Sequence, residues 1–362
     1  MHLGIRSEQA PSERRVAATP QSVSSLVALG VKVTVESGAG LGAGFTDDQY
    51  IEAGAHVVDR FTPDAPLDIF ATVGPFVETD TRLLADGAVV IGMLEPVDHQ
   101  GSLSLLAEQG VTVLVMEQVP RTTLAQSMDA LSSQATAAGY AAVLLGAREL
   151  PKFLPMLITA AGTVPPARVL ILGVGVAGLQ AIATAKRLGG VVSAYDIRPE
   201  TREQVESLGA SFVDAPTMTM DEGGYARAID EEQMAEQRRV LTATVSASDL
   251  VITTAQVPGR KAPVLVDSAM VGAMAPGSII IDMAAGSGGN VEGSRPDEVV
   301  TIGGVVIHGP TNLASSVASD ASRMYARNIL EVVKRLIVDG EKVIDPDDPV
   351  IGPITFVPEG AA

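Results

Sequence analysis

Short apolar runs alternate along the chain with longer stretches in which apolar residues recur every three or four positions. In the first third, the apolar runs predict strands at residues 3–5, 31–35, 68–73, 88–93 and 111–116. Helical periodicity and helix-start residues between them predict helices at residues 20–29, 47–54, 79–86 and 102–109. Strands that alternate with helices at this spacing are typical of α/β proteins, so we expect a parallel-sheet domain here.

The middle of the chain changes character. Residues 122–157 are rich in Ala, Leu, Ser and Gln, which predicts a long connecting helix that is broken near Gly139 or Pro151. A linker at 162–166 precedes later strands at 211–213, 249–254, 278–282 and 305–308, and a polar loop with a short helix is expected within 218–237. A second long helix, at 314–338, returns the chain to the first domain. We therefore expect two domains, residues 1–135 with 315–362 and residues 140–312.

The strongest local motif opens the second domain. An apolar run leads into Gly173, Gly175 and Gly178, spaced as G-x-G-x-x-G, and a helix-forming segment follows. In dinucleotide sites the first glycine permits the tight turn, the second lets the backbone approach the pyrophosphate, and the third lets the helix pack on the strand. The next apolar run ends on Asp196, where a carboxylate accepts from a ribose 2′-hydroxyl and repels a 2′-phosphate. The motif thus predicts NAD(H) over NADP(H), a preference that Arg198 weakens slightly.

Composition narrows the class of protein further. A net charge of −18 argues against nucleic acid or an anionic membrane surface as a direct partner. The absence of cysteine excludes thiol chemistry, and the four histidines are too scattered to predict a metal site. Glycine and proline interrupt the most apolar region, residues 153–185, and the N-terminus lacks an apolar signal core, so we expect no membrane span.

Two segments give the chain a family resemblance. Residues 121–133 are RTTLAQSMDALSS, and residues 162–190 are GTVPPARVLILGVGVAGLQAIATAKRLGG. Together they resemble the NAD(H)-binding component, domain I of the alpha subunit, of proton-translocating NAD(P) transhydrogenase. The resemblance runs from the RVAATP segment at residues 15–20 to the region of Asn312. It implies an α/β fold of two Rossmann-like domains with mostly parallel sheets, joined by long connecting helices, with a cleft between them.

Alanine dehydrogenases are related to this family, and three positions separate the two groups. Alanine dehydrogenases carry a Lys after the third strand and a His after the next strand. Here residues 68–78 contain no Lys, and Met93-Leu94 stands where His-Leu would be expected. Their catalytic Asp aligns with Gly286. Because those groups perform acid–base chemistry on an amino acid, whereas hydride transfer between two nicotinamides requires only placement, the absences favour a transhydrogenase.

The resemblance also implies which residues hold the cofactor. The nicotinamide and its ribose would be surrounded by Arg121, Gln126, Ser127, Met128, Asp129 and Ser132, of which Arg121, Gln126 and Asp129 position the ring without acid–base catalysis. One helical face could present Gln126 and Asp129 together, although a polar cap on a connecting helix is the alternative. The other implied contacts are Gly173, Gly175, Val176, Ala177, Gly178, Asp196, Ile197, Arg198, Gly224, Tyr225, Gln237 and Gln256.

Several single positions have simpler interpretations. Gly224 could belong to a plain flexible turn. Relatives usually have Leu where Gln256 stands, so a main-chain contact is the expectation there. Asp282 fits either a capping role or the site, and we expect Arg14 and Arg15 in structural ion pairs.

The function implied by the resemblance involves other subunits. The chain would form a homodimer, bind NAD(H), and pass the hydride of NADH to NADP⁺ on a separate NADP(H)-binding subunit. A membrane-embedded proton-channel subunit would couple this reaction to proton translocation, and the chain would be attached peripherally to the cytoplasmic side of the membrane. Two alternatives stay open: an alanine dehydrogenase-like enzyme that acts alone, and a non-catalytic module that senses NAD(H).

Overall fold

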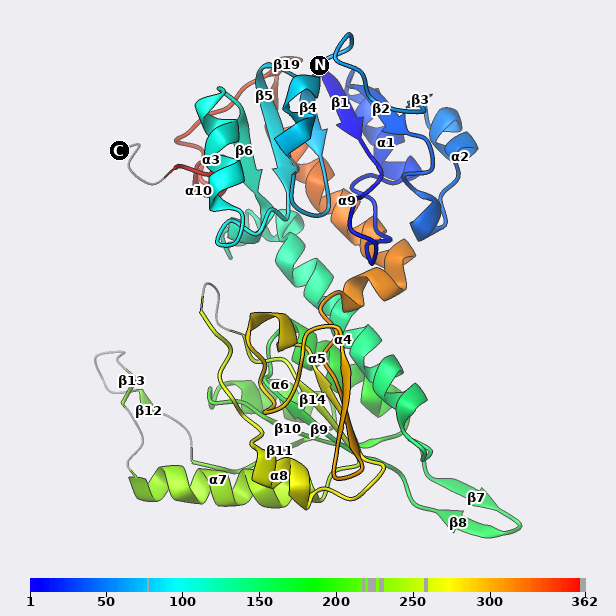
Figure 1. Cartoon of the computed structure of the whole chain (residues 1–362), viewed down its shortest axis with the longest axis vertical. Coiled ribbons are helices and arrows are strands. Elements are labelled where there is room, and N and C mark those ends of the chain that lie inside the picture. The colour runs from blue at the N-terminus through cyan, green and yellow to red at the C-terminus, as the bar shows by residue number, and fades with distance from the viewer. Residues whose placement is uncertain (77, 217–218, 221–225, 228–230, 257–259, 359–362) are drawn as a thin grey trace. The chain divides into compact units, whose positions relative to one another are not determined.

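The computed structural model describes residues 1–76, 78–216, 219–220, 226–227, 231–256 and 260–358. The chain forms two compact units, Met1–Gln134 with Ala314–Ala362, and Ala135–Leu313. Each unit is built on one mostly parallel sheet, of six strands in the first and seven in the second, with helices on both faces (Figure 1). The α/β class predicted from the sequence is confirmed.

The sheet of the first unit is entirely parallel, in the order β3-β2-β1-β4-β5-β6. Its strands are β1 (His2–Ile5), β2 (Lys32–Glu36), β3 (His56–Val58), β4 (Leu67–Ala71), β5 (Leu84–Gly92) and β6 (Thr112–Val115). The strand order reverses between β1 and β4, so the loops after these two strands diverge at the carboxyl edge of the sheet.

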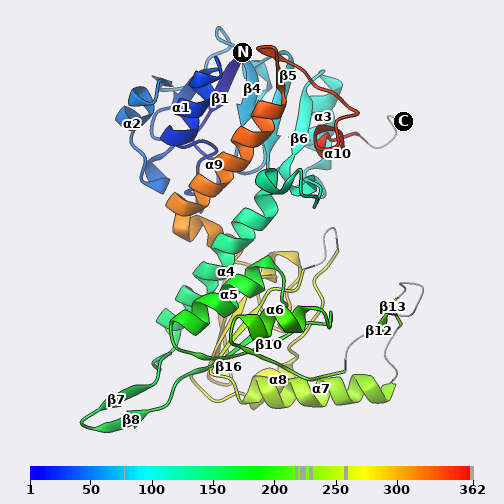
Figure 2. The ribbon, with the colours of Figure 1, turned by 180° about the vertical axis from the view of Figure 1, so that it is seen from behind.

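Helices cover both faces of this sheet. Helix α3 (Gln100–Glu108) lies on one face, and α1 (Pro20–Ala28) and α9 (Ala318–Arg335) lie on the other, as Figures 1 and 2 show from opposite sides. Thr19 caps α1 and Pro20 is its first residue, as expected of a helix start. The unit is completed by α2 (Asp47–Glu52), the ladder β18 (Ile337–Val338) with β19 (Glu341–Lys342), and α10 (Ile351–Ile354).

The sheet of the second unit has the order β11-β10-β9-β14-β15-β17-β16, and the strand order reverses between β9 and β14. Only its edge strand β16 is antiparallel. The strands are β9 (Arg168–Leu172), β10 (Val191–Tyr195), β11 (Ser211–Phe212), β14 (Leu250–Thr253), β15 (Ile279–Asp282), β16 (Val299–Ile302) and β17 (Val305–His308). Strands β9, β14 and β15 are buried along most or all of their length, as in sheets covered on both faces.

The helices of the second unit also form two layers. Helices α7 (Glu231–Ser246) and α8 (Ser268–Ala273) lie on one face of the sheet, and α4 (Ala130–Glu149), α5 (Val176–Arg187) and α6 (Thr201–Ser207) lie on the other (Figures 1 and 2). Two hairpins stand apart from the sheet, β7 (Leu157–Thr159) with β8 (Gly162–Val164) and β12 (Thr219–Met220) with β13 (Ala226–Arg227).

Tertiary packing overrides several local expectations. The helix expected at residues 79–86 is a 3₁₀ turn followed by β5, because Leu84 pairs in parallel with Leu67 of β4. The helix expected over residues 122–157 is α4 alone, and it runs unbroken through Gly139 and ends before Pro151. The expected linker at 162–166 begins with β8, and the helix within 218–237 is the much longer α7. The short strands β3 and β16 were not predicted, because each depends on a partner strand more than on its own pattern.

Candidate nucleotide-binding site

The glycine-rich turn between β9 and α5 has the geometry that its sequence predicts. Gly173 has φ +97°, in the region that favours glycine, and a Cβ there would lie 2.6 Å from Thr254 Oγ1. A Cβ on Gly178 would lie 2.0 Å from the carbonyl oxygen of Gly173. The first glycine therefore permits the turn and the third permits the close packing of α5 on β9, as expected.

Gly175 has free space around its Cα, whereas Gly173 and Gly178 do not. It is the N-terminal cap of α5 with an extended backbone, and a Cβ built on it would meet no protein atom within 4 Å. The apolar side chains of Val176 and Ile197, which follow β9 and β10, are 42% and 49% exposed. An open backbone at a helix N-terminus beside exposed apolar side chains fits a dinucleotide pyrophosphate and its flanking groups.

Asp196 is buried at the end of β10 and ties the turn together. Its Oδ2 accepts from the main-chain N of Val174 at 2.7 Å, and its Oδ1 accepts from N and Nε of Arg198 at 2.9 and 3.0 Å. Arg198 Nη2 also donates to the carbonyl oxygen of Val174. Burial alone raises the pKa of Asp196, but the hydrogen bonds from Arg198 and Val174 outweigh burial and hold that pKa below its ordinary value. Asp196 is thus an ionised acceptor whose charge is balanced by Arg198.

The side chain of Gln237 binds within the protein at the same edge. Its Nε2 donates to the hydroxyl of Tyr195 and to the carbonyl oxygen of Pro216, both at 2.7 Å, and so fastens α7 to the end of β10. Gly224 and Tyr225, the other residues expected near the adenosine, lie outside the described residues.

A buried carboxylate–amide pair holds the loops after β14 and β15. The carboxylate of Asp282 accepts from Thr253 Oγ1 and from the main-chain N of Asn290, which are the contacts that a capping role predicts. The side chain of Asn290 grips Ala255 twice, donating to its carbonyl oxygen and accepting from its N–H. Gln256 is exposed, and its Nε2 donates to the carbonyl oxygen of Met283.

The segment expected at the nicotinamide is not a single helical face. Gln126 lies in a 3₁₀ turn, η4 (Gln126–Met128), and Asp129 caps the start of α4, because its carboxylate accepts from both N and Oγ of Ser132. The side chains of Arg121, Gln126 and Ser127 are exposed. Met128 is 5% exposed in the core of the first unit, so only its main chain could reach a ligand.

Structural contacts hold the two loops, after β4 and after β5, where alanine dehydrogenases carry the Lys and the His. After β4, the carboxylate of Glu8 accepts from the main-chain N of Val73 and of Gly74. The buried hydroxyl of Tyr325 bridges the next loops, donating to the carbonyl oxygen of Thr72 and accepting from the main-chain N of Met93. Burial raises the pKa of Glu8. Glu8, Tyr325 and Asn290 were not predicted from the sequence, because most of their partners lie far away in the chain.

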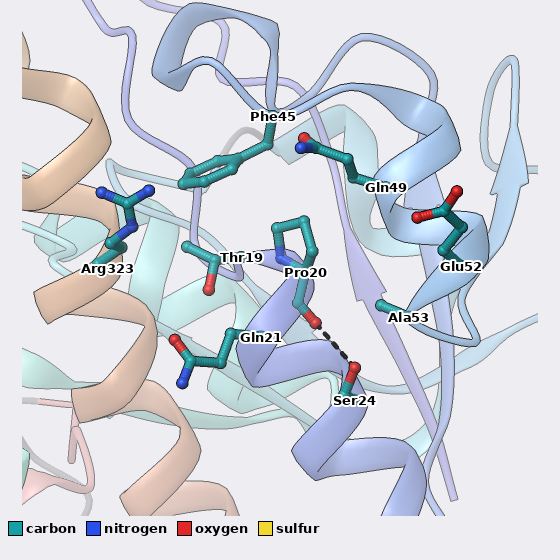
Figure 3. A pocket seen from close by; sticks show the side chains of 9 residues that line it. All are labelled: Thr19, Pro20, Gln21, Ser24, Phe45, Gln49, Glu52, Ala53 and Arg323. Carbon is teal, nitrogen blue, oxygen red and sulfur yellow. Dashed lines mark hydrogen bonds between the residues drawn. The ribbon is translucent and has the colours of Figure 1, made fainter.

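A separate surface pocket of about 420 Å³ lies in the first unit between α1, α2 and α9 (Figure 3). The guanidinium of Arg323 lies 5.5 Å from the centroid of the Phe45 ring at its rim. Within the described ranges, we find no cluster of three or more His, Asp or Glu side chains suited to a metal ion. Among the described helices, none is long and apolar enough to cross a membrane.

The two units and the glycine turn define a class of two-domain dinucleotide-binding proteins. Residues 4–138 match the family described as alanine dehydrogenase/PNT, N-terminal domain, and residues 142–362 match its C-terminal domain. The chain therefore belongs to the alanine dehydrogenase/PNT family.

Within this family the chain is similar to transhydrogenase alpha subunits over nearly its whole length. The chain is 43% identical to an NAD(P) transhydrogenase alpha-subunit polypeptide of Rickettsia prowazekii, over 99% of this chain and 95% of that protein. The crystal structure of transhydrogenase from Sinorhizobium meliloti superposes with a TM-score of 0.89 at 41% identity, covering 98% of each chain. An L-alanine dehydrogenase structure has a TM-score of 0.82 at 28% identity, covering 99% of this chain and 95% of that one. These matches place the chain with the alpha subunits of NAD(P) transhydrogenases.

Proposed function

We propose that this chain is the NAD(H)-binding component of a proton-translocating transhydrogenase. In this reaction the hydride of NADH passes to NADP⁺ held on a partner subunit, giving NAD⁺ and NADPH. The observation that carries the proposal is the turn at Gly175, whose backbone is open at the start of α5 beside the ionised carboxylate of Asp196.

The residues of this chain would act by binding and orientation. The N–H groups at the start of α5, from Val176 to Gly178, would bind the pyrophosphate, and Asp196 would accept from a ribose hydroxyl. When it is bound, the nicotinamide supplies the transferable hydride. Gln126 and Asp129 would fix which face of the ring is presented, because a carboxamide needs both a donor and an acceptor to be oriented. The capping of α4 by Asp129 supports this role by fixing its carboxylate.

We further propose that the chain acts as a homodimer with a membrane-embedded proton-channel subunit and an NADP(H)-binding subunit. It would then lie peripherally on the cytoplasmic side of the membrane. The hairpin β7–β8 supports self-association, because Ile158 is 77% exposed on it and Met156, just before it, is 56% exposed.

Rapid-quench mixing tests the proposed function. The purified chain loaded with NADH is mixed with an NADP⁺-loaded domain from a transhydrogenase, and the NADPH formed is separated from NADH and quantified through a single turnover, because the two reduced nicotinamides absorb light alike. Transfer in the first turnover supports the proposal. NADH oxidation by pyruvate and ammonia with the chain alone would instead establish an alanine dehydrogenase, and tight NADH binding without any transfer would indicate a sensor.

A further inference from the structure

A buried asparagine on α9 holds the segment that carries Gln126, Asp129 and Ser132. Asn328 is 6% exposed, and its Nδ2 donates to the carbonyl oxygen of Ser127 at 2.8 Å. Its Oδ1 accepts from the hydroxyl of Ser133 at 2.7 Å. One side chain therefore grips this segment on both sides of Asp129.

The grip continues to the RVAATP segment through Gln134. Gln134 Nε2 donates to the hydroxyl of Ser133 at 3.1 Å, and its Oε1 accepts from Arg15 Nη1 at 2.9 Å. Arg15 is in turn held by the carboxylate of Glu13, which accepts from its Nε at 2.8 Å and its Nη2 at 2.6 Å. The side chains of Arg15 and Glu13 are only 10% and 6% exposed. All of these residues belong to the first unit.

Asn328 does not stabilise α9 through its own helix propensity. Asparagine is a weaker helix former than alanine or leucine, and a buried amide without partners is strongly destabilising. A satisfied buried network, by contrast, fixes its members in a single arrangement. Met128 of this turn packs in the core, whereas the side chains of Gln126 and Ser127 are exposed and contribute no packing. The hydrogen bond from Asn328 to the carbonyl oxygen of Ser127 therefore adds a second hold on this turn, through its main chain.

We propose that Asn328 is a positioning residue for hydride transfer, acting through Ser127 and Ser133, and that Arg15 and Gln134 anchor it. The RVAATP segment would then support hydride transfer without contacting the substrate. The inference rests on the proposed function, since the residues that Asn328 positions are those proposed to orient the nicotinamide.

The test compares two substitutions on α9, one at Asn328 in its interior and one at Arg335, its last residue. Asn328→Leu keeps the branching and the number of heavy atoms of the side chain but removes the donor and the acceptor. Arg335→Gln is the matched control, because it breaks the half-buried ion pair with Asp348 and leaves η4 untouched. Ser133→Ala, which removes one hydroxyl and is the milder change, serves if Asn328→Leu fails to fold.

Four readouts are measured on the purified chain: the Kd for NADH, the transfer rate, amide hydrogen exchange and Tm. For Asn328→Leu we expect the Kd for NADH to stay within about twofold and the single-turnover transfer rate to fall by roughly 10- to 100-fold, the scale of an ångström-sized misplacement. Amide hydrogen exchange over residues 122–133 should accelerate in Asn328→Leu, and to a lesser extent in Ser133→Ala. Arg335→Gln should lower Tm without changing the transfer rate or the exchange in this segment.

Two results would overturn the inference. One is unchanged exchange over residues 122–133 in Asn328→Leu or Ser133→Ala. The other is an equal loss of transfer in Arg335→Gln, which would mean that general destabilisation of α9 explains the effect. If the unsubstituted chain transfers no hydride, the proposed function fails, whereas the exchange measurement still decides whether Asn328 holds the segment.

Discussion

Replacing Gly139 of α4 by alanine should weaken nucleotide binding, even though Gly139 is not one of the residues predicted to bind the cofactor. A Cβ at this position would lie 2.2 Å from the carbonyl oxygen of Ala177, in the first turn of α5. That is 0.8 Å short of the 3.0 Å below which real Cβ contacts essentially never occur. The neighbouring atoms are main chain, so no side chain can rotate to relieve the overlap.

The first turn of α5 has little room to move away. Gly178, also in this turn, already packs against Gly173 so closely that a Cβ on Gly178 would lie 2.0 Å from the carbonyl oxygen of Gly173. Over-packing of this kind destabilises a fold by about 1–3 kcal/mol, which exceeds the roughly 1 kcal/mol that alanine gains over glycine within a helix. A shift of the turn would also misalign the N–H groups proposed to bind pyrophosphate. The loss of one such charge-assisted bond, about 1.5–3 kcal/mol, corresponds to a roughly 10- to 100-fold increase in Kd.

The assay is fluorescence titration with NADH, accompanied by thermal unfolding. Gly146→Ala is the matched control on the same helix, because the nearest atoms to its Cβ would belong to the buried side chain of Leu250 and not to the main chain of α5. We expect Gly139→Ala to bind NADH more weakly and Gly146→Ala to bind it normally. Wild-type affinity and Tm in Gly139→Ala would refute the reasoning, as would an equal loss of affinity in both variants.

Three further predictions follow from the site and the hairpin. Gln126→Asn should slow single-turnover transfer and leave the NADH Kd nearly unchanged; equal losses of both would make Gln126 a binding or structural residue. Asp196→Asn should lose roughly 2 kcal/mol in urea unfolding at neutral pH, because it weakens charge-assisted hydrogen bonds. Since the folded pKa of Asp196 lies below the ordinary 3.8, its contribution is complete above pH 3.8 and lost as the pH falls through the folded pKa. The difference between variant and wild type should therefore shrink below pH 3.8, and a difference that stays constant down to pH 2 would contradict this. Ile158→Asp should shift the chain from dimer to monomer in light scattering after gel filtration, and an unchanged mass would exclude the hairpin from the interface.

The sequence by itself determined the class of fold and the nucleotide turn, because both depend on neighbours in the chain. Alternating strand and helix patterns identified most elements of the two sheets. The positive φ of Gly173 and the contact of Gly178 with the carbonyl oxygen of Gly173 are local features of the turn, so both were predictable. The absence of Lys and His at the dehydrogenase positions could also be read directly from the sequence.

Only the tertiary structure decided how the segment from Gln126 to Ser132 is held. The sequence pattern of that segment is helical, yet the carboxylate of Asp129 caps the start of α4, and the residues before it form a 3₁₀ turn. Gly139 looked like a helix break because glycine is a poor helix former, whereas its missing side chain makes room for the backbone of α5. Asn328 and Ser127 are 201 residues apart, and no local pattern reports a hydrogen bond across that separation. Periodicity records which side of an element is buried, but the partners of a buried polar group depend on where the rest of the chain folds.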